Sequence, residues 1–103
     1  MSVHHLERLF QPKSIAVIGA STKPQRAGAV VMRNLLAGGF DGPIMPVNPN
    51  RTHVAGVLCY PNIGGLPLVP DLAVICSPSD TVAGQIFELG RRGVKVAIAI
   101  TGA

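Results

Sequence analysis

The sequence predicts an α/β fold in which a parallel β-sheet is covered by helices on both faces. Three observations favour this class. Of the 103 residues, 48% are apolar and only 14% are charged, which is typical of a compact domain with buried strands. Four short apolar runs are strand-like, and two segments with helical spacing lie between them in the order strand–helix–strand, twice. The chain is long enough for one core and too short for two, so we expect one domain.

The first strand is predicted at SIAVIG (14–19), a β-branched and continuously apolar run that ends on glycine. Such a run is typical of a strand that is buried on both faces. A helix is predicted next, because apolar residues then recur at positions i, i+3, i+4 and i+8. These residues are Ala27, Val30, Val31 and Leu35. Gly38 and Gly39 follow, and a glycine in the left-handed conformation is expected to end this helix there.

The second strand is predicted at PIMPV (43–47). Pro46 either weakens this assignment or lies where no ladder hydrogen bond is needed. In the segment after it, prolines and glycines exclude a long helix, although GVLCY (56–60) can pair as a brief strand. We expect a short helical turn at 62–66 and otherwise loop.

The second strand–helix–strand unit begins with the run DLAVICS (71–77). Pro78 provides a turn after this strand, and Ser79 or Asp80 is expected to cap the next helix. The predicted apolar stripe of that helix is Val82, Ile86 and Leu89. Two arginines lie at its carboxyl end before Gly93 stops it; they are Arg91 and Arg92. The last strand is predicted at VKVAIAI (94–100).

This order of elements requires parallel strands with right-handed crossovers, which is a Rossmann-like, doubly wound parallel sheet. The chain stops at ITGA (100–103), directly beyond the fourth main strand, whereas complete doubly wound sheets generally have further strands. We therefore expect a sheet truncated after its fourth main strand, and a domain, 1–103, that is the amino-terminal module of a larger protein.

Composition argues against several function classes. The net charge of +4 and the pI near 9.7 come from cations spread along the chain, which favours a solvated surface over a nucleic-acid patch. One Tyr and three Phe are too few for a platform that stacks bases. No signal peptide or membrane-spanning run is recognisable. Cys59 and Cys76 lie in apolar runs and not in a CxxC pair, so we expect free thiols in the cytoplasm and no metal site.

The loop that follows the first predicted strand, GASTKPQRAG (19–28), has the features of an anion site. Ligands of open parallel sheets bind beyond the carboxyl ends of the strands, and the amino end of a helix attracts phosphate. Gly19 permits close backbone approach and Ser21 offers a hydroxyl, while Lys23 and Arg26 add positive charge. We expect this loop to hold a diphosphate. The alternative is a tight turn flanked by solvated cations.

The second loop, VNPNR (47–51), indicates which nucleotide would bind. A dinucleotide site usually combines GxGxxG with an acidic residue at this strand end, and both are missing here. Asn48 can hydrogen-bond a ribose without repelling a phosphate, and Arg51 can pair with one. The loop therefore favours a phosphorylated ribose, either that of coenzyme A or that of NADP.

The remaining loops are less informative. Ser77 and Pro78 fit a wall of the nucleotide cleft, although a strand end followed by a helix cap explains them nearly as well. Thr101 brings a small side chain to the mouth of the sheet. No catalytic constellation is recognisable, and the histidines are expected to be surface residues. They are His4, His5 and His53.

Four segments together resemble one family: PKSIAVIGAS, RAGAVVMRNLLAGGFDGPIMPVNPN, GVLCYPNIGGLPLVPDLAVICSP and GVKVAIAITGA. They are similar to the CoA-binding domain of nucleoside-diphosphate-forming acyl-CoA synthetases, which are related to the succinyl-CoA synthetase alpha subunit. The resemblance covers nearly the whole chain. KPQRAG and MRNLLAGGF further resemble the amino-terminal domain of bacterial protein-lysine acetyltransferases, in which synthetase-like domains are fused to an N-acetyltransferase domain.

The resemblance implies that coenzyme A, or acyl-CoA, is the ligand and that its contacts lie on the loops described above. The implied contact residues are Gly19, Ala20, Ser21, Lys23, Arg26, Asn48, Pro49, Arg51, Ser77, Pro78 and Thr101. It implies no catalytic residue, because the histidine that the synthetases phosphorylate lies well beyond this length of chain. Lys23 and Pro24 make the first loop longer than in the succinyl-CoA synthetase alpha subunit.

We therefore expect a domain that binds coenzyme A without turning it over and whose partners are further domains of the same polypeptide. Two alternatives stay open at this point. One is an NADP-dependent oxidoreductase domain, against which the missing GxGxxG counts. The other is a nucleotide-sensing regulatory domain, although no helix-turn-helix or clustered basic stripe supports it.

Overall fold

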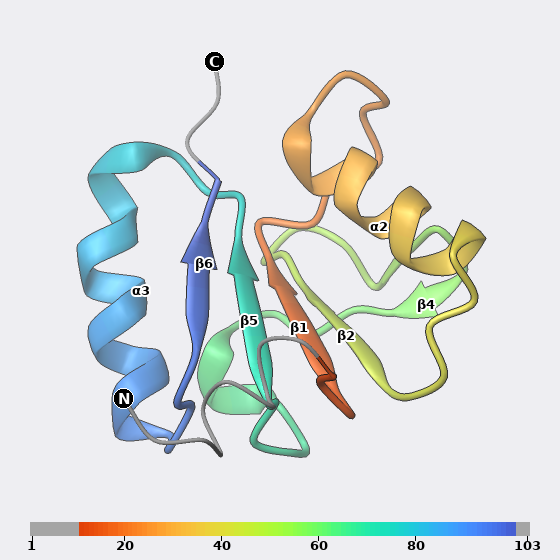
Figure 1. Ribbon diagram of the computed structural model, residues 1–103. Coiled ribbons are helices and arrows are strands. Elements are labelled where there is room, and N and C mark those ends of the chain that lie inside the picture. The colour runs from red at the N-terminus through yellow and green to blue at the C-terminus, as the bar shows by residue number, and fades with distance from the viewer. Residues whose placement is uncertain (1–10, 101–103) are drawn as a thin grey trace.

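A computed structural model describes residues 11–100 and confirms the α/β class (Figure 1). Its main sheet has four parallel strands in the order β2-β1-β5-β6. The strands are β1 (Ile15–Ile18), β2 (Ile44–Val47), β5 (Leu72–Ile75) and β6 (Ala97–Ala99). All four lie inside the predicted runs, and β6 is much shorter than 94–100. From β1 the chain passes to β2 on one side. It later forms β5 and β6 on the other side of β1, so the direction of strand addition reverses between β1 and β5.

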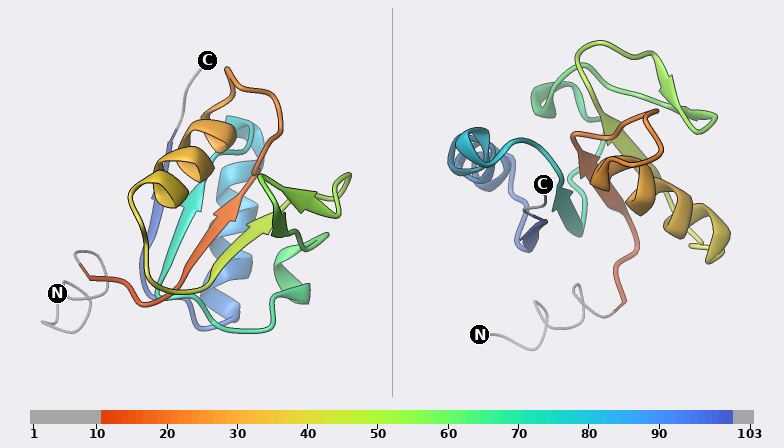
Figure 2. Two further views of the ribbon diagram at one scale, coloured as in Figure 1. Left: turned by 90° about the vertical axis from the view of Figure 1, so that its right-hand side faces the viewer. Right: turned by 90° about the horizontal axis from the view of Figure 1, so that it is seen from above.

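Helices α2 (Ala27–Ala37) and α3 (Ser79–Arg91) cover opposite faces of this sheet, as Figure 2 shows. The steps from β1 to β2 and from β5 to β6 run in opposite directions across the sheet. Because both crossovers are right-handed, the connecting helices fall on opposite sides. The sheet is therefore doubly wound, as the sequence predicts.

Alternate residues of β1 and β5 enter two separate cores, which explains why the sequences of these two strands are apolar throughout. The core on the α3 face contains Ala16, Ile18, Met45, Val47, Ile63, Leu66, Ala73, Ile75 and Leu89. The core on the α2 face contains Ile15, Val17, Ala20, Met32, Val54, Cys59, Leu72 and Val74.

Helix α2 presents its predicted stripe to the sheet only in part: Val31 and Leu35 pack against the core on the α2 face. Its buried residues are Gly28 and Met32, whereas Ala27 and Val30 are only half-buried. The helix is turned this way because Gly28 has no side chain and its backbone approaches β1 closely. The left-handed stop is Gly39, with φ +71°, while Gly38 keeps a helical conformation.

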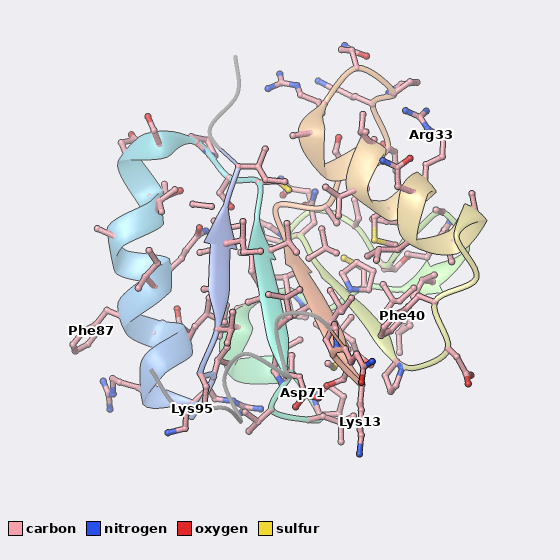
Figure 3. The ribbon with its side chains drawn as sticks, in the orientation of Figure 1. Lys13, Arg33, Phe40, Asp71, Phe87 and Lys95 are labelled. Carbon is pink, nitrogen blue, oxygen red and sulfur yellow. The ribbon has the colours of Figure 1, made fainter. Side chains whose placement is uncertain are left out.

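Helix α3 also differs from the prediction in its cap and its stripe. The N-cap residue is Pro78, not Ser79 or Asp80, and the Thr81 hydroxyl donates to the Pro78 carbonyl at 2.7 Å. Ile86, which the stripe included, is 49% exposed, and Phe87 projects away from the helix (Figure 3). The helix ends before Gly93, whose φ of +96° confirms the predicted stop.

Between β2 and β5 the chain forms a small hairpin and one helical turn. Strands β3 (His53–Val54) and β4 (Val57–Leu58) pair antiparallel, so the GVLCY segment contributes a brief strand as expected. The 3₁₀ turn η1 (Ile63–Gly65) lies within the predicted 62–66, and the Asn62 carboxamide oxygen caps it by accepting from Gly65 N at 2.8 Å.

The backbone nitrogen and carbonyl of Pro46 lie on the outer side of the edge strand β2 and face away from β1. Its carbonyl accepts a hydrogen bond from Tyr60 N at 2.9 Å, and Asn48 N donates in turn to the Tyr60 carbonyl at 3.0 Å. The proline therefore occupies a position where its missing N–H removes no bond to β1.

Hydrogen bonds from Arg92 and from Lys13 hold the periphery of the fold. Arg92, just after α3, donates to the carbonyl oxygens of Leu66 at 2.6 Å, Gly64 at 3.3 Å and Leu68 at 3.5 Å. At the amino ends of the strands, Lys13 N donates to the Asp71 carboxylate at 2.9 Å, and Figure 3 shows both residues at that end of the sheet. Across residues 11–100, neither helix has the length and apolar character needed to cross a membrane.

Candidate functional site

An open cleft with a volume of about 880 Å³ lies at the carboxyl ends of the strands, where the loops after β1, β2 and β5 meet. The cleft brings together ten of the eleven predicted contact residues: Gly19, Ala20, Ser21, Lys23, Arg26, Asn48, Pro49, Arg51, Ser77 and Pro78. Thr101 lies outside the described residues, as do His4 and His5. His53 is exposed in β3 and does not line this cleft.

Gly19 brings the first loop into contact with the third. Its φ of +84° favours glycine, and a Cβ here would lie 2.8 Å from the Ser77 hydroxyl oxygen and 2.9 Å from Ser77 N. Gly28, at the second position of α2, also permits a close approach, since a Cβ there would overlap the Gly19 carbonyl oxygen. These two glycines let the amino end of α2 and the loop after β5 both approach the end of β1.

The start of α2 offers unused hydrogen-bond donors to the cleft. Gly19 N and Ala20 N both donate to the Val47 carbonyl, at 3.0 and 3.2 Å, so they are engaged within the sheet. By contrast, no described residue accepts a hydrogen bond from four other N–H groups. These belong to Ser21, Thr22, Ala27 and Gly28. Free N–H groups at a helix amino end, together with the helix dipole, attract an anion.

The Asn48 carboxamide joins the first and second loops. Its Nδ2 donates to the Ala20 carbonyl at 2.8 Å, and its Oδ1 accepts from Asn50 N at 2.8 Å. The sequence interpretation gave Asn48 a direct contact with ribose. The structure shows that this side chain also fixes the shape of the cleft, because it ties the ends of β1 and β2 together.

Positive charge lies on one side of the cleft. Lys23 and Arg26 come from the first loop and Arg51 from the second, and all three side chains are exposed. The Ser21 hydroxyl accepts from Lys23 N at 3.0 Å, which folds the first loop back on itself. A ligand with several phosphates fits this side, since exposed guanidinium groups bind phosphate through paired hydrogen bonds.

Neither free cysteine is an activated nucleophile. Burial raises the pKa of the Cys76 thiol, which lines the cleft, and burial likewise raises the pKa of Cys59 despite its Sγ contacts with the Asn48 and Tyr60 carbonyls. Both thiols therefore stay protonated at neutral pH. In the part of the chain that the structure describes, no three metal-ligating side chains gather.

A second wall of the cleft was missed by sequence reasoning. It consists of Thr81, Gln85 and Glu88 from α3, with Pro61, Asn62 and Ile63 from the segment that leads into η1. A correct helical stripe would have found the α3 residues. Nothing in the sequence signals that η1 would pack beside α3.

Comparison with known proteins decides the family. A family model described as a CoA binding domain matches residues 13–103, nearly the whole chain. The chain belongs to the CoA-binding domain family. Coenzyme A is the ligand by which this family is defined, so the cofactor expected from the resemblance is confirmed, in preference to NADP.

This CoA-binding domain is similar to acetate–CoA ligases whose names specify ADP formation. It is 38% identical over 100 residues to acetate–CoA ligase [ADP-forming] II of Archaeoglobus fulgidus, which is 97% of this chain and 15% of the relative. It is 42% identical over 95 residues to the alpha subunit of acetate–CoA ligase [ADP-forming] I of Pyrococcus furiosus, which is 88% of this chain and 21% of that subunit. The chain thus spans about a fifth of these relatives or less.

A solved structure has the same fold over almost the whole CoA-binding domain. It is the dinucleotide-forming acetyl-coenzyme A synthetase 1 of Ca. Korarchaeum cryptofilum, in complex with phosphate and ADP. The TM-score is 0.90 with 46% identity, over 98% of this chain and 22% of that one. The resemblance to synthetase CoA-binding domains is therefore confirmed in sequence and in structure.

Proposed function

We propose that this domain binds coenzyme A in the cleft, with the diphosphate at the amino end of α2. The observation that carries the proposal is that no described residue accepts a hydrogen bond from the N–H groups of Ser21, Thr22 and Ala27, which line the cleft beside the cations Lys23 and Arg26. A diphosphate supplies acceptors to all of these donors. At this open site the N–H and guanidinium groups exchange water for phosphate oxygens, and the charge on the phosphate makes the new hydrogen bonds stronger.

The 3′-phosphate on the ribose is assigned to Arg51, with Arg26 as the alternative partner. Arg51 follows the end of β2, where this fold holds the ribose, and its exposed guanidinium lines the cleft. Asn48 and Pro49 shape the ribose position. The thioester arm would start from Ser77 and Pro78 and follow the α3 side of the cleft, so that its thiol faces a partner domain.

Calorimetry with coenzyme A and dephospho-CoA tests this assignment. Arg51→Ala is expected to weaken coenzyme A about tenfold or more, because it removes a charge-assisted contact, and to weaken dephospho-CoA far less. Arg33→Ala is the matched control, since Arg33 is exposed on α2 and does not line this cleft. Equal affinity of the wild-type protein for the two ligands would reject the contact with the ribose phosphate.

For the whole protein, we propose that residues 1–103 are the amino-terminal module of a longer cytoplasmic polypeptide whose other domains perform the chemistry. KPQRAG and MRNLLAGGF favour a protein-lysine acetyltransferase, in which this module would supply coenzyme A binding or regulation. The relatives reported above favour an ADP-forming acyl-CoA synthetase. An assay of the complete protein separates the two: acetyl transfer from acetyl-CoA to protein lysine supports the first, and ATP formation from acetyl-CoA, ADP and phosphate supports the second.

A further inference from the structure

The buried stripe of α3 contains a carboxamide where an apolar side chain would be expected. Val82 and Leu89 pack into the core on the α3 face, and Gln85 is the residue three after the first and four before the second. That spacing places Gln85 on the same face of the helix. Ile86, next to it, is 49% exposed.

The Gln85 side chain is also incompletely satisfied. Its Oε1 atom is buried, yet no hydrogen-bond partner for it exists among the described residues. A buried carbonyl without a donor is unfavourable, and an apolar side chain at this position would avoid that cost. Gln85 lines the cleft, so rotation about its own side-chain torsions can present the carboxamide there without any change in the backbone.

The polarity of the cleft indicates which part of a ligand lies beside Gln85. The cations that line it, Lys23, Arg26 and Arg51, come from the loops after β1 and β2. The wall formed by α3 contributes no cation to the cleft. Coenzyme A has a matching division, with all of its phosphates at one end and an uncharged pantetheine arm with two secondary amides at the other.

We propose that Gln85 is a specificity residue that hydrogen-bonds an amide of the pantetheine arm, in the part of the cleft between α3 and the Pro61–Ile63 segment. The inference rests on the proposed binding of coenzyme A. A secondary amide offers both a donor and an acceptor, so the carboxamide is complementary to it whichever way its oxygen and nitrogen are placed.

Binding of coenzyme A and of adenosine 3′,5′-bisphosphate, which lacks the arm, tests the proposal. Gln85→Met keeps the length of the side chain and removes the carboxamide. It is expected to raise the Kd of coenzyme A about three- to tenfold and to leave that of the bisphosphate unchanged. The melting temperature of the ligand-free variant should equal or exceed that of the wild type, because an unpartnered buried group is lost. Gln11→Met, at an exposed glutamine outside the cleft, is the matched control.

The outcomes separate this inference from the proposed function. If Gln85→Met binds coenzyme A as tightly as the wild type, or weakens both ligands equally, the role of Gln85 is overturned while the cleft stands. If the wild-type protein binds neither ligand, the proposed function itself fails, and the inference with it.

A measurement on the unmutated chain covers the case in which Gln85→Met does not fold. The side-chain NH₂ resonances of Gln85 should shift on addition of coenzyme A and stay unchanged with adenosine 3′,5′-bisphosphate. A shift with both ligands, or with neither, would overturn the contact with the arm.

Discussion

At the scale of single residues, the shape of the cleft depends on the absence of side chains. Gly19 lets the loop after β5 reach the end of β1, and Gly28 lets α2 begin directly against the Gly19 carbonyl. The same contact brings Ala27, at the start of the first helical turn, to the cleft. The close approach of Gly28 to the end of β1 and the predicted anion site therefore share one geometry.

Alanine substitution at two helical glycines separates packing from propensity. Gly28→Ala is expected to lower the free energy of unfolding by about 1–3 kcal/mol, because its methyl group meets backbone that has no room to move. Gly84→Ala on α3, where nothing lies within 4 Å, should instead raise it by about 0.5–1 kcal/mol. Urea denaturation of both variants checks the difference. A Gly28→Ala protein as stable as the wild type would contradict the close approach.

At the scale of elements, α3 and η1 are held together by one arginine. Arg92 lies just past the carboxyl end of α3 and donates to three backbone carbonyls of the Gly64–Leu68 segment. Leu66 packs into the core on the α3 face, and the arginine adds hydrogen bonds to the backbone around it. Arg92 therefore holds η1 against the carboxyl end of α3, on the side of the cleft that Gln85 lines.

Methionine substitution at neighbouring arginines tests this clamp. Arg92→Met should lower the free energy of unfolding by about 1–2 kcal/mol, because the half-buried Leu66 carbonyl loses its donor. Arg91→Met should change it by less than about 0.5 kcal/mol, since Arg91 is exposed and only stacks 6.0 Å over the exposed Phe87 ring. Thermal and urea unfolding measure both effects. Equal losses in the two variants would show that the carbonyl contacts contribute nothing.

The elements also show where sequence reasoning succeeds and where it fails. Strands β1 and β5 were predictable because a strand buried on both faces is apolar at every position. The rotation of α3 about its axis was not predictable. Gln85 and Ile86 are adjacent, and hydrophobicity alone assigns the isoleucine, not the glutamine, to the buried face. The burial of Met32 on α2 was not predictable either, because the other buried residue of that helix is Gly28, which adds nothing to a hydrophobic pattern. The loops of the cleft were found because strand ends mark them, whereas the wall at Pro61–Ile63 depends on tertiary packing.

At the scale of the whole molecule, charge and topology act together. The reversal of strand order between β1 and β5 opens a crevice at one edge of the sheet, and the cations of the first two loops lie on its rim. The chain as a whole carries a net charge of +4. A polyanionic ligand is therefore attracted both by its contacts in the cleft and by the field of the entire domain.

Ionic strength should weaken coenzyme A binding for this reason. Raising the salt concentration from about 50 mM to about 500 mM is expected to raise the Kd severalfold, because screening shortens the range of charge interactions at this exposed rim. Dephospho-CoA, which carries less charge, should show a smaller change. Titration calorimetry at several salt concentrations gives both slopes, and an affinity that does not depend on salt would argue against phosphate recognition.

The proline on the outer side of β2 restricts how this sheet can grow. Pro46 presents no donor there, and the Tyr60 backbone already occupies its carbonyl, so this border is a poor template for an incoming strand. Edge-to-edge aggregation is thereby discouraged on one side. Any strand recruited to extend the sheet, whether from the same polypeptide or from another, would be directed to the opposite border beside β6.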